Sequence, residues 1–297
     1  MVKAKNKLKA LSINEELGDI PTHYMKSGSS MRPKEQLLGL GEFKRRIIPE
    51  YYRDCPFDYD VWYNTNELST IRSFLYTDFL GKGIYLRVNS IIINDRVLGT
   101  IVEDPTLEID EDRIKKITDN LENKYTLELV SEYPEKIIFL PGSNQMNKGL
   151  IHWGKVKKLV DEGWKIKPHP ITAHVWIADL RQKYGYTNVL NKKGDAMSLL
   201  KNCTHLAVCP NSEMGLSGLL LKKQLVSVAC ARKDREKNLV TYDSIYTQIG
   251  NRPSTTVALK KILSSKRSGI IFSFDEDAEE RLERYLESFW SYTFRKP

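Results

Sequence analysis

Residues 163–170 have the sequence GWKIKPHP, a short apolar stretch that runs into two prolines. A residue before proline is kept out of the helical region, so Lys167 and His169 are both expected to be extended. Residues two apart in an extended chain project to the same side. The sequence therefore predicts a strand that ends in a cation and an imidazole, a pair suited to a phosphate-bearing ligand. The alternative is an ordinary strand-to-helix turn that contains a surface histidine.

The segments around this stretch alternate between two patterns. Short apolar runs typical of buried strands lie at 136–140, 164–167, 187–190, 205–209 and 224–228. Apolar residues at helical spacing separate them, over 150–162, 171–184, 196–201 and 215–222. Asp195 stands where it can cap the third of these helices. Strands that alternate with helices in this way predict a parallel sheet covered on both faces.

The first half of the chain alternates less regularly. Candidate strands lie at 10–13, 60–63, 83–87, 90–94 and 98–102, and a charged helix is expected over 113–125. The segment 128–135 is the natural boundary between two halves. An amphipathic helix over 275–292 closes the chain, with acidic residues early and basic residues after it, as the helix dipole prefers.

Composition narrows the classes of protein that the chain can belong to. With 297 residues, 41% of them hydrophobic, it can fill two cores of roughly 130–150 residues each. No apolar run is long enough for a membrane span, and residues 1–9 do not look like a secretory signal, so we expect a cytoplasmic protein with no membrane partner. The four cysteines show no metal-binding spacing. The net charge of +8 favours a polyanionic partner.

Three polar loops follow the predicted strands of the second half. Ligands of open α/β sheets bind outside the carboxyl ends of the strands, so these loops are expected to form one cationic crevice. Its candidate binding residues are Ser143, Asn144, Lys148, Lys167, His169, Ser212 and Glu213. The last two open a helix whose first amides can bind a phosphate or sugar oxygen, and Glu213 could instead accept hydrogen bonds from sugar hydroxyls. Ordinary helix capping is the alternative. No ATPase loop, hydrolase elbow or dinucleotide fingerprint occurs.

A strand that ends in Lys-Pro-His-Pro and a later strand that leads to Ser-Glu-x-Gly resemble the donor half of GT-B glycosyltransferases, especially capsule-polysaccharide and polysialic-acid transferases. The resemblance covers residues 136–228. It implies an α/β protein in which two Rossmann-like domains face a cleft, and it implies donor roles for Lys167, His169, Ser212 and Glu213. The expected division is an acceptor-binding domain (1–132), a nucleotide-sugar-binding domain (133–272) and a C-terminal helix (273–297) that crosses back to the first domain.

An inverting transferase needs a carboxylate in its first domain to take the proton of the acceptor hydroxyl. The candidates are Glu15, Glu16 and Asp104. Glu15 and Glu16, with Gly18, are similar to the paired-acid-glycine motif of the sialic-acid families, although Leu17 interrupts it; solvated charge is the alternative reading of both loops. No tightly bound cofactor or metal is implied, although a divalent metal is compatible with the chemistry, and the cationic crevice can itself offset the leaving diphosphate.

The basic, compact character of the chain resembles that of bacteriophage DNA glycosyltransferases, which attach glucose or arabinose to 5-hydroxymethylcytosine. This resemblance implies transfer from a UDP-sugar to that base in phage DNA, reached by extruding the nucleotide. Lys44, Arg45, Arg46 and Arg72 are the candidate phosphate contacts. Two alternatives stay open: a cytosolic glycosyltransferase of capsule or other surface polysaccharide, and a non-catalytic nucleotide- or nucleic-acid-binding protein.

Overall fold

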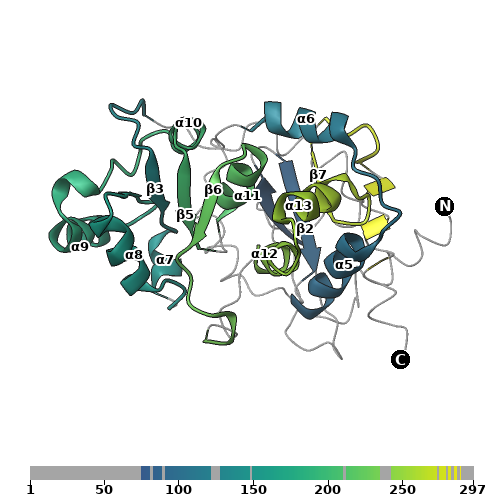
Figure 1. Ribbon diagram of the computed structural model, residues 1–297, viewed down its shortest axis with the longest axis horizontal. Helices are drawn as coiled ribbons and strands as arrows, with labels where there is room; N and C mark the ends of the chain where they lie inside the picture. The colour runs from purple at the N-terminus through teal and green to yellow at the C-terminus, as the bar shows by residue number, and fades with distance from the viewer. Residues whose placement is uncertain are drawn as a thin grey trace, which may run out of the picture. The chain divides into compact units, whose positions relative to one another are not determined.

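The computed structural model divides into two compact units, one of residues 1–117 and 247–297 and the other of residues 118–246 (Figure 1). The residues it describes are 75–80, 83–88, 91–121, 128–147, 149–209, 212–234, 242–272, 274–278, 280, 281, 284, 285 and 288. Residues 247–272 belong to the first unit in this division, whereas the sequence placed them in the nucleotide-sugar-binding domain. The functional division into 1–132, 133–272 and 273–297 stays a prediction.

The second unit contains the parallel sheet that the sequence predicts. Its strands are β3 (Lys136–Phe139), β4 (Lys165–Lys167), β5 (His205–Val208) and β6 (Gln224–Ser227). They lie in the order β4-β3-β5-β6, and every neighbouring pair is parallel. The predicted third strand at 187–190 is reduced to one parallel bridge, from Val189 to Ile166 beside β4. The predicted α/β class is therefore confirmed, and the arrangement of two Rossmann-like domains around a cleft stays a prediction.

The chain order of these strands creates a reversal at β3. From β3 the chain moves outward to β4 and to the Val189 bridge, and it then returns to the other side of β3 to form β5 and β6. This is the order 3-2-1-4-5 seen in Rossmann-type sheets, and the place where the order reverses is where such sheets bind ligands. In this unit that place lies outside the carboxyl ends of β3 and β5.

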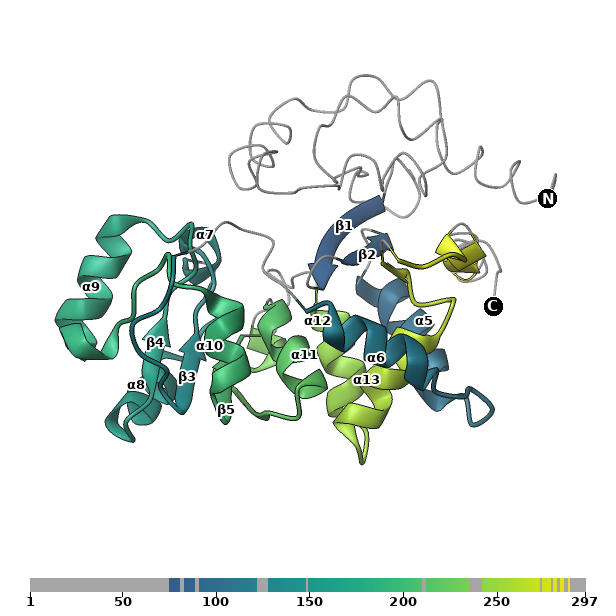
Figure 2. The ribbon, with the colours of Figure 1, turned by 90° about the horizontal axis from the view of Figure 1, so that it is seen from above.

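Helices connect the strands and cover the sheet. They are α7 (Ser143–Met146), α8 (Trp153–Asp161), α9 (His174–Tyr184), α10 (Ala196–Asn202) and α11 (Glu213–Leu220). A short 3₁₀ turn, η2 (Tyr186–Asn188), follows α9. Figure 2 shows α7, α8, α9 and α10 arranged around β3 and β4. Asp195 caps α10 as expected, since its carboxylate accepts a hydrogen bond from the Ser198 backbone.

Two glycines allow α11 to pack closely against β5. An ideal Cβ placed on Gly218 would lie 2.8 Å from both Leu206 methyl carbons, and one on Gly215 would lie 2.8 Å from Val208 Cγ2. Real Cβ atoms do not approach other atoms this closely. Because Leu206 is fully buried, it has little room to move away. The glycines therefore fix the distance between the helix and the strand.

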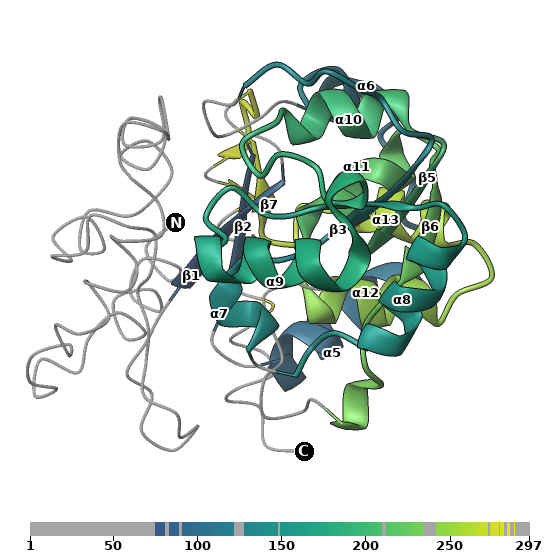
Figure 3. The ribbon, with the colours of Figure 1, turned by 90° about the vertical axis from the view of Figure 1, so that its left-hand side faces the viewer.

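The described strands of the first unit are antiparallel. β1 (Leu75–Leu80) pairs with β2 (Gly83–Val88), and β2 pairs with β7 (Ile270–Ile271), as Figure 3 shows. Three helices accompany them: α5 (Ile91–Glu103), α6 (Glu111–Asp119) and α13 (Thr255–Ser264). A further helix, α12 (Asp243–Gly250), spans one of the two divisions between the units, and α6 spans the other. The predicted strands at 10–13 and 60–63 lie outside the described residues.

The strands predicted at 90–94 and 98–102 are wrong, because residues 91–94 and 98–102 lie within α5 and residue 90 is outside the described residues. Their β-branched residues favour strands, but the positions described as buried along this segment are Asn94, Val97, Leu98, Ile101 and Val102. These positions recur at helical spacing and form one face of a helix. The expected helix over 113–125 corresponds to α6, and the expected strand at 83–87 is confirmed as β2.

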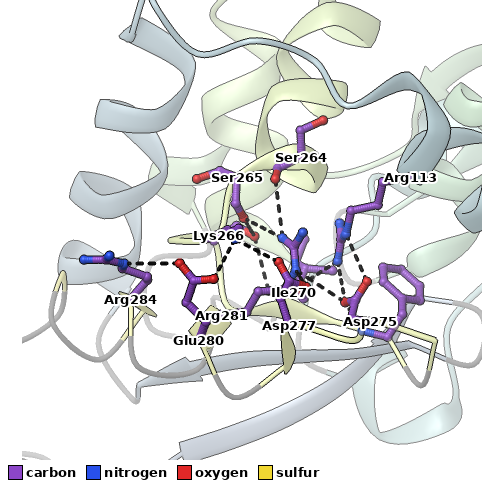
Figure 4. A network of polar contacts seen from close by, with 12 residues as sticks. Arg113, Ser264, Ser265, Lys266, Ile270, Asp275, Asp277, Glu280, Arg281 and Arg284 are labelled. Atoms are coloured by element: carbon purple, nitrogen blue, oxygen red, sulfur yellow. Dashed lines mark hydrogen bonds and ion pairs between the residues drawn. The ribbon is translucent and has the colours of Figure 1, made fainter. Parts of the chain in front are cut away.

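A buried ionic network joins α6 to residues 263–281 in the first unit (Figure 4). Arg113 of α6 donates to both carboxylate oxygens of Asp275, at 3.1 and 2.6 Å, and also to the carbonyls of Leu263 and Ile270. Asp275 in turn accepts the Phe272 backbone N–H at 2.7 Å. Both side chains of the pair are at least 95% buried, with exposures of 5% and 3%. Arg113 therefore has its charge neutralised and its donors used inside the protein.

None of the helices among the described residues is long and apolar enough to cross a membrane.

Gly218→Ala is expected to lower the free energy of unfolding by about 1–3 kcal/mol, because the added methyl group overpacks the contact with Leu206. Gly250→Ala is the matched control: that position is also helical, and an ideal Cβ there meets nothing within 4 Å. Urea unfolding of both variants measures the difference. Equal stabilities would contradict the close packing of α11 on β5.

Asp275→Asn is expected to cost about 3–5 kcal/mol of unfolding free energy, because it leaves the Arg113 cation buried without its counter-charge. Glu280→Gln is the control, since Glu280 pairs with Lys266 at a half-exposed position where ion pairs contribute little. Chemical denaturation of the two variants should separate them clearly. A loss below 1 kcal/mol for Asp275→Asn would show that the network does not hold this unit together.

Candidate functional site

The candidate site is the edge of the four-stranded sheet at which its strands end. Because β3, β4, β5 and β6 are parallel, the turns that follow them all lie at this edge. The turns after β3 and β5 flank the reversal of strand order, and the turn after β4 is next to the turn after β3. Neighbouring strands are about 4.8 Å apart, so the turns after β4 and β5 are separated by about 10 Å. An extended ligand could reach from one to the other.

The turns after β3 and β4 are joined directly. Ser143 Oγ accepts the backbone N–H of Ala173 at 2.7 Å. The neighbouring Gly142 leaves room for the second turn, since an ideal Cβ there would lie 3.0 Å from Ile171 Cδ1 and 4.0 Å from His169 Nδ1. The structure thus brings together Ser143 and His169, which the sequence selected as binding residues on separate loops.

The ring orientation of His169 is fixed by its own turn. Its Nδ1 accepts the backbone N–H of Ile171 at 3.3 Å. A neutral imidazole that accepts at Nδ1 carries its proton on Nε2, so Nε2 is the donor of this ring. His169 is partly exposed, as a ligand contact requires. His169 is therefore prepared to donate a hydrogen bond to an anion.

Lys167 has a different environment from the one the sequence suggested. Its ammonium group donates to the carbonyls of Pro168 and Lys192, at 2.8 and 2.7 Å, and the residue is only 2% exposed. Lysine has three donors, so one is left for any further partner. Burial lowers the pKa of Lys167 to about 8, and the nearby Asp195 carboxylate opposes that shift. The contact predicted between Lys167 and a ligand phosphate stays a prediction; what the structure shows is a link between the end of β4 and the loop before α10.

A second lysine, Lys192, connects the same two segments in the opposite direction, from the loop before α10 to the turn after β4. Lys192 donates through its ammonium group to the carbonyl of Thr172, at 2.8 Å. Lys167 and Lys192 thus bind each other's loops through backbone carbonyls, which holds the turn after β4 in place. Sequence reasoning did not select Lys192, because no local pattern distinguishes it from the neighbouring Lys193.

The turn after β5 carries the other two predicted residues. Ser212 is the N-cap of α11, and its Oγ accepts the Met214 backbone N–H at 3.3 Å. Glu213 is the first residue of that helix and is partly exposed. Capping, which the sequence offered as the alternative to ligand binding, is therefore observed for Ser212, and its contact with a ligand stays a prediction. A capping hydroxyl keeps its own proton, so this role leaves Ser212 able to donate to a ligand.

The first turn of α9 supplies further donors at the same edge. Its N-cap is Ala173, which has no side chain that can accept a hydrogen bond from the helix. The first amides of a helix have no partner within the helix, and together with the helix dipole they favour anions. α9 and α11 therefore both present positive helix ends beside the turns that carry His169 and Ser212.

Asp104, the general-base candidate among the described residues, lies in the first unit. Asp104 follows a helix, α5, and not a strand as expected. Its carboxylate accepts from the side chain and backbone of Thr106, at 2.7 and 3.0 Å, and pairs with Arg267 at 3.3 Å. These contacts, led by the Thr106 hydroxyl, lower the pKa of Asp104. A carboxylate with a lowered pKa is a weaker base.

Several other predicted residues lie where the structure gives no description. These are Glu15, Glu16, Lys44, Arg45, Arg46, Arg72 and Lys148, and the side chain of Asn144. Among the described residues, no three histidine, cysteine or acidic side chains lie close enough together to hold a metal ion. Known protein families and curated proteins were both compared with the chain, and no match was found.

The stability of the protein should increase with pH where Lys167 titrates. Between about pH 8 and 10.5 the unfolded chain binds a proton that the folded chain has released, so unfolding becomes less favourable as pH rises. Relative to Lys167→Met, which does not titrate, the natural protein should gain about 3 kcal/mol of unfolding free energy across this window. Denaturation of both proteins at closely spaced pH values measures the gain. A difference that stays constant from pH 7 to 10.5 would contradict a buried, charged Lys167.

Proposed function

We propose that this chain is a glycosyltransferase and that its second unit binds a UDP-sugar with the diphosphate at the carboxyl edge of the parallel sheet. The observation that carries the proposal is the joining of the turns after β3 and β4, through Ser143 and Ala173, beside the reversal of strand order. His169 belongs to one of these turns. Ser212 and Glu213 lie after β5, the strand on the other side of β3, at the start of α11.

The donors at this edge suit a diphosphate. Ser143 and Ser212 each accept a backbone N–H and keep their own O–H to donate. His169 donates from Nε2, and the first turns of α9 and α11 add backbone amides. Lys167 is protonated at neutral pH and places a positive charge behind the turn after β4. Such donors stabilise negative charge as it builds up on a leaving group.

The proposed reaction needs no redox partner. The acceptor hydroxyl oxygen forms a bond to the anomeric carbon of the sugar, and its proton passes to a carboxylate base. The bond between the anomeric carbon and the β-phosphate oxygen breaks, and UDP leaves with that electron pair. The lowered pKa of Asp104 makes it a poorer base, which favours Glu15 or Glu16 for this step.

The acceptor that we propose is the hydroxyl of 5-hydroxymethylcytosine in phage DNA, with glucose or arabinose as the transferred sugar. The net charge of +8 supports a polyanionic acceptor. Lys44, Arg45, Arg46 and Arg72 are the proposed phosphate contacts. The two competing proposals are transfer to a capsule or other surface glycan, and binding of a nucleotide or nucleic acid without transfer.

One assay separates these three proposals. The protein is incubated with UDP-glucose or UDP-arabinose and with DNA that contains 5-hydroxymethylcytosine. The DNA is then digested, and the masses of its nucleosides are measured by mass spectrometry. A sugar added to the modified nucleoside supports transfer to DNA, whereas turnover with oligosaccharide acceptors alone supports the surface-glycan proposal. Binding of UDP without any turnover supports the non-catalytic proposal. A protein that neither binds UDP nor uses UDP-sugars would contradict the proposed donor site.

His169→Ala is expected to weaken UDP binding between about 10-fold and about 100-fold, because it removes a hydrogen bond to a charged ligand. DNA affinity should stay within a factor of two. The matched control is His205→Ala, since His205 begins β5 and so lies at the opposite edge of the sheet. Titration calorimetry with UDP measures both variants. Equal UDP affinities for the two variants would show that His169 does not contribute to UDP binding.

A further inference from the structure

Tyr246 belongs to α12, and its side chain contacts the start of α11, which is distant in the sequence. Its hydroxyl donates to the backbone carbonyl of Ser212 at 2.7 Å, across 34 positions of the chain. Burial, together with the charges of Glu213 and Asp243, raises the pKa of Tyr246, so the hydroxyl keeps its proton at any working pH.

Gly215 leaves the space that this hydroxyl occupies. A Cβ on Gly215 would collide with the Tyr246 oxygen and would also lie 3.1 Å from its ring carbon Cζ. The two residues are therefore matched: the tyrosine hydroxyl can stand at the first turn of α11 only because residue 215 has no side chain. This match is independent of the hydrogen bond to Ser212 and points to the same placement.

The hydrogen bond determines the direction of a donor at the proposed site. Tyr246 holds the carbonyl of the peptide that joins Ser212 to Glu213. In a trans peptide the N–H points away from the C=O, so fixing this carbonyl also fixes the direction of the Glu213 N–H. That N–H is one of the first amides of α11, which have no partner within the helix. Tyr246 itself does not need to touch the ligand.

We infer that Tyr246 is a positioning residue for the donor substrate: through its hydrogen bond to Ser212 it sets the orientation of the α11 start against the diphosphate of the nucleotide-sugar. The inference rests on the proposed function. It assigns to α12 a part in donor binding that none of the sequence motifs indicates. Because a positioning contact matters most when the leaving group gains charge, its loss should affect turnover of the donor and leave acceptor binding unchanged.

Tyr246→Phe tests this inference directly. We expect kcat/KM for the UDP-sugar to decrease about tenfold, with the KM for the acceptor unchanged, because one orienting hydrogen bond is lost. The matched control is Tyr184→Phe: the Tyr184 hydroxyl is buried and has no hydrogen-bond partner among the described residues. The control should keep the natural kcat/KM. A merely structural role of Tyr246 would lower the melting temperature without this selective loss in donor use.

Gly215→Ala provides a second variant that acts on the same contact. The added methyl group should displace the Tyr246 hydroxyl and reproduce the donor defect. The double variant Gly215→Ala/Tyr246→Phe should then be no worse than Gly215→Ala alone, since both changes remove one interaction. If the decreases in kcat/KM of the two single variants multiply in the double variant, the two residues do not act through one shared contact.

Measurements on the natural protein and on Tyr246→Phe distinguish a wrong role for Tyr246 from a wrong donor site. If the natural protein binds UDP and turns over a UDP-sugar while Tyr246→Phe matches it in kcat/KM, only the role of Tyr246 is overturned. If the natural protein itself neither binds UDP in calorimetry nor uses UDP-sugars, the donor site is overturned, and the role of Tyr246 falls with it.

Discussion

The parallel pairing of β3 with both β4 and β5 is the constraint on which the proposed site depends. It makes three strands from distant parts of the sequence end at one edge, and it places the reversal of strand order between β3 and β5. The turns 140–143 and 168–173 and the N-cap of α11 at Ser212 are neighbours for that reason alone. Without this register, Ser143, His169 and Ser212 would be unrelated polar residues on the surface.

Three side chains hold the turns at this edge through backbone carbonyls: Lys167, which the sequence selected as a binding residue, and Lys192 and Tyr246, which it did not. Lys167 and Lys192 connect the turn after β4 to the loop before α10, and Tyr246 with Gly215 connects the turn after β5 to α12. Each of these hydrogen bonds ends on a backbone carbonyl, so it orients the backbone and does not use the side chain of His169 or Ser212. In the first unit, the buried ion pair between Arg113 and Asp275 stabilises the fold instead, because each side chain neutralises the charge of the other.

Sequence patterns predicted the second unit well because its strands are short, continuous apolar runs bounded by turn residues. They failed over α5, where Val97, Val102 and several isoleucines favour strands, while burial against the rest of the first unit follows a helical period. Lys167 shows a second limit. The X-Pro rule correctly indicated an extended backbone, but it could not indicate that the ammonium group would donate to a carbonyl 25 residues away, that of Lys192. Tyr246 could not have been found, since its partner is fixed only by the tertiary fold.

A crystal structure of the protein with UDP decides whether one diphosphate binds across the carboxyl edge of the second unit. We expect diphosphate oxygens within hydrogen-bonding distance of His169 Nε2 and of the first amides of α11, with the Tyr246 hydroxyl still bound to Ser212. A nucleotide bound at the amino edge of the sheet, or outside the second unit, would rule out this site.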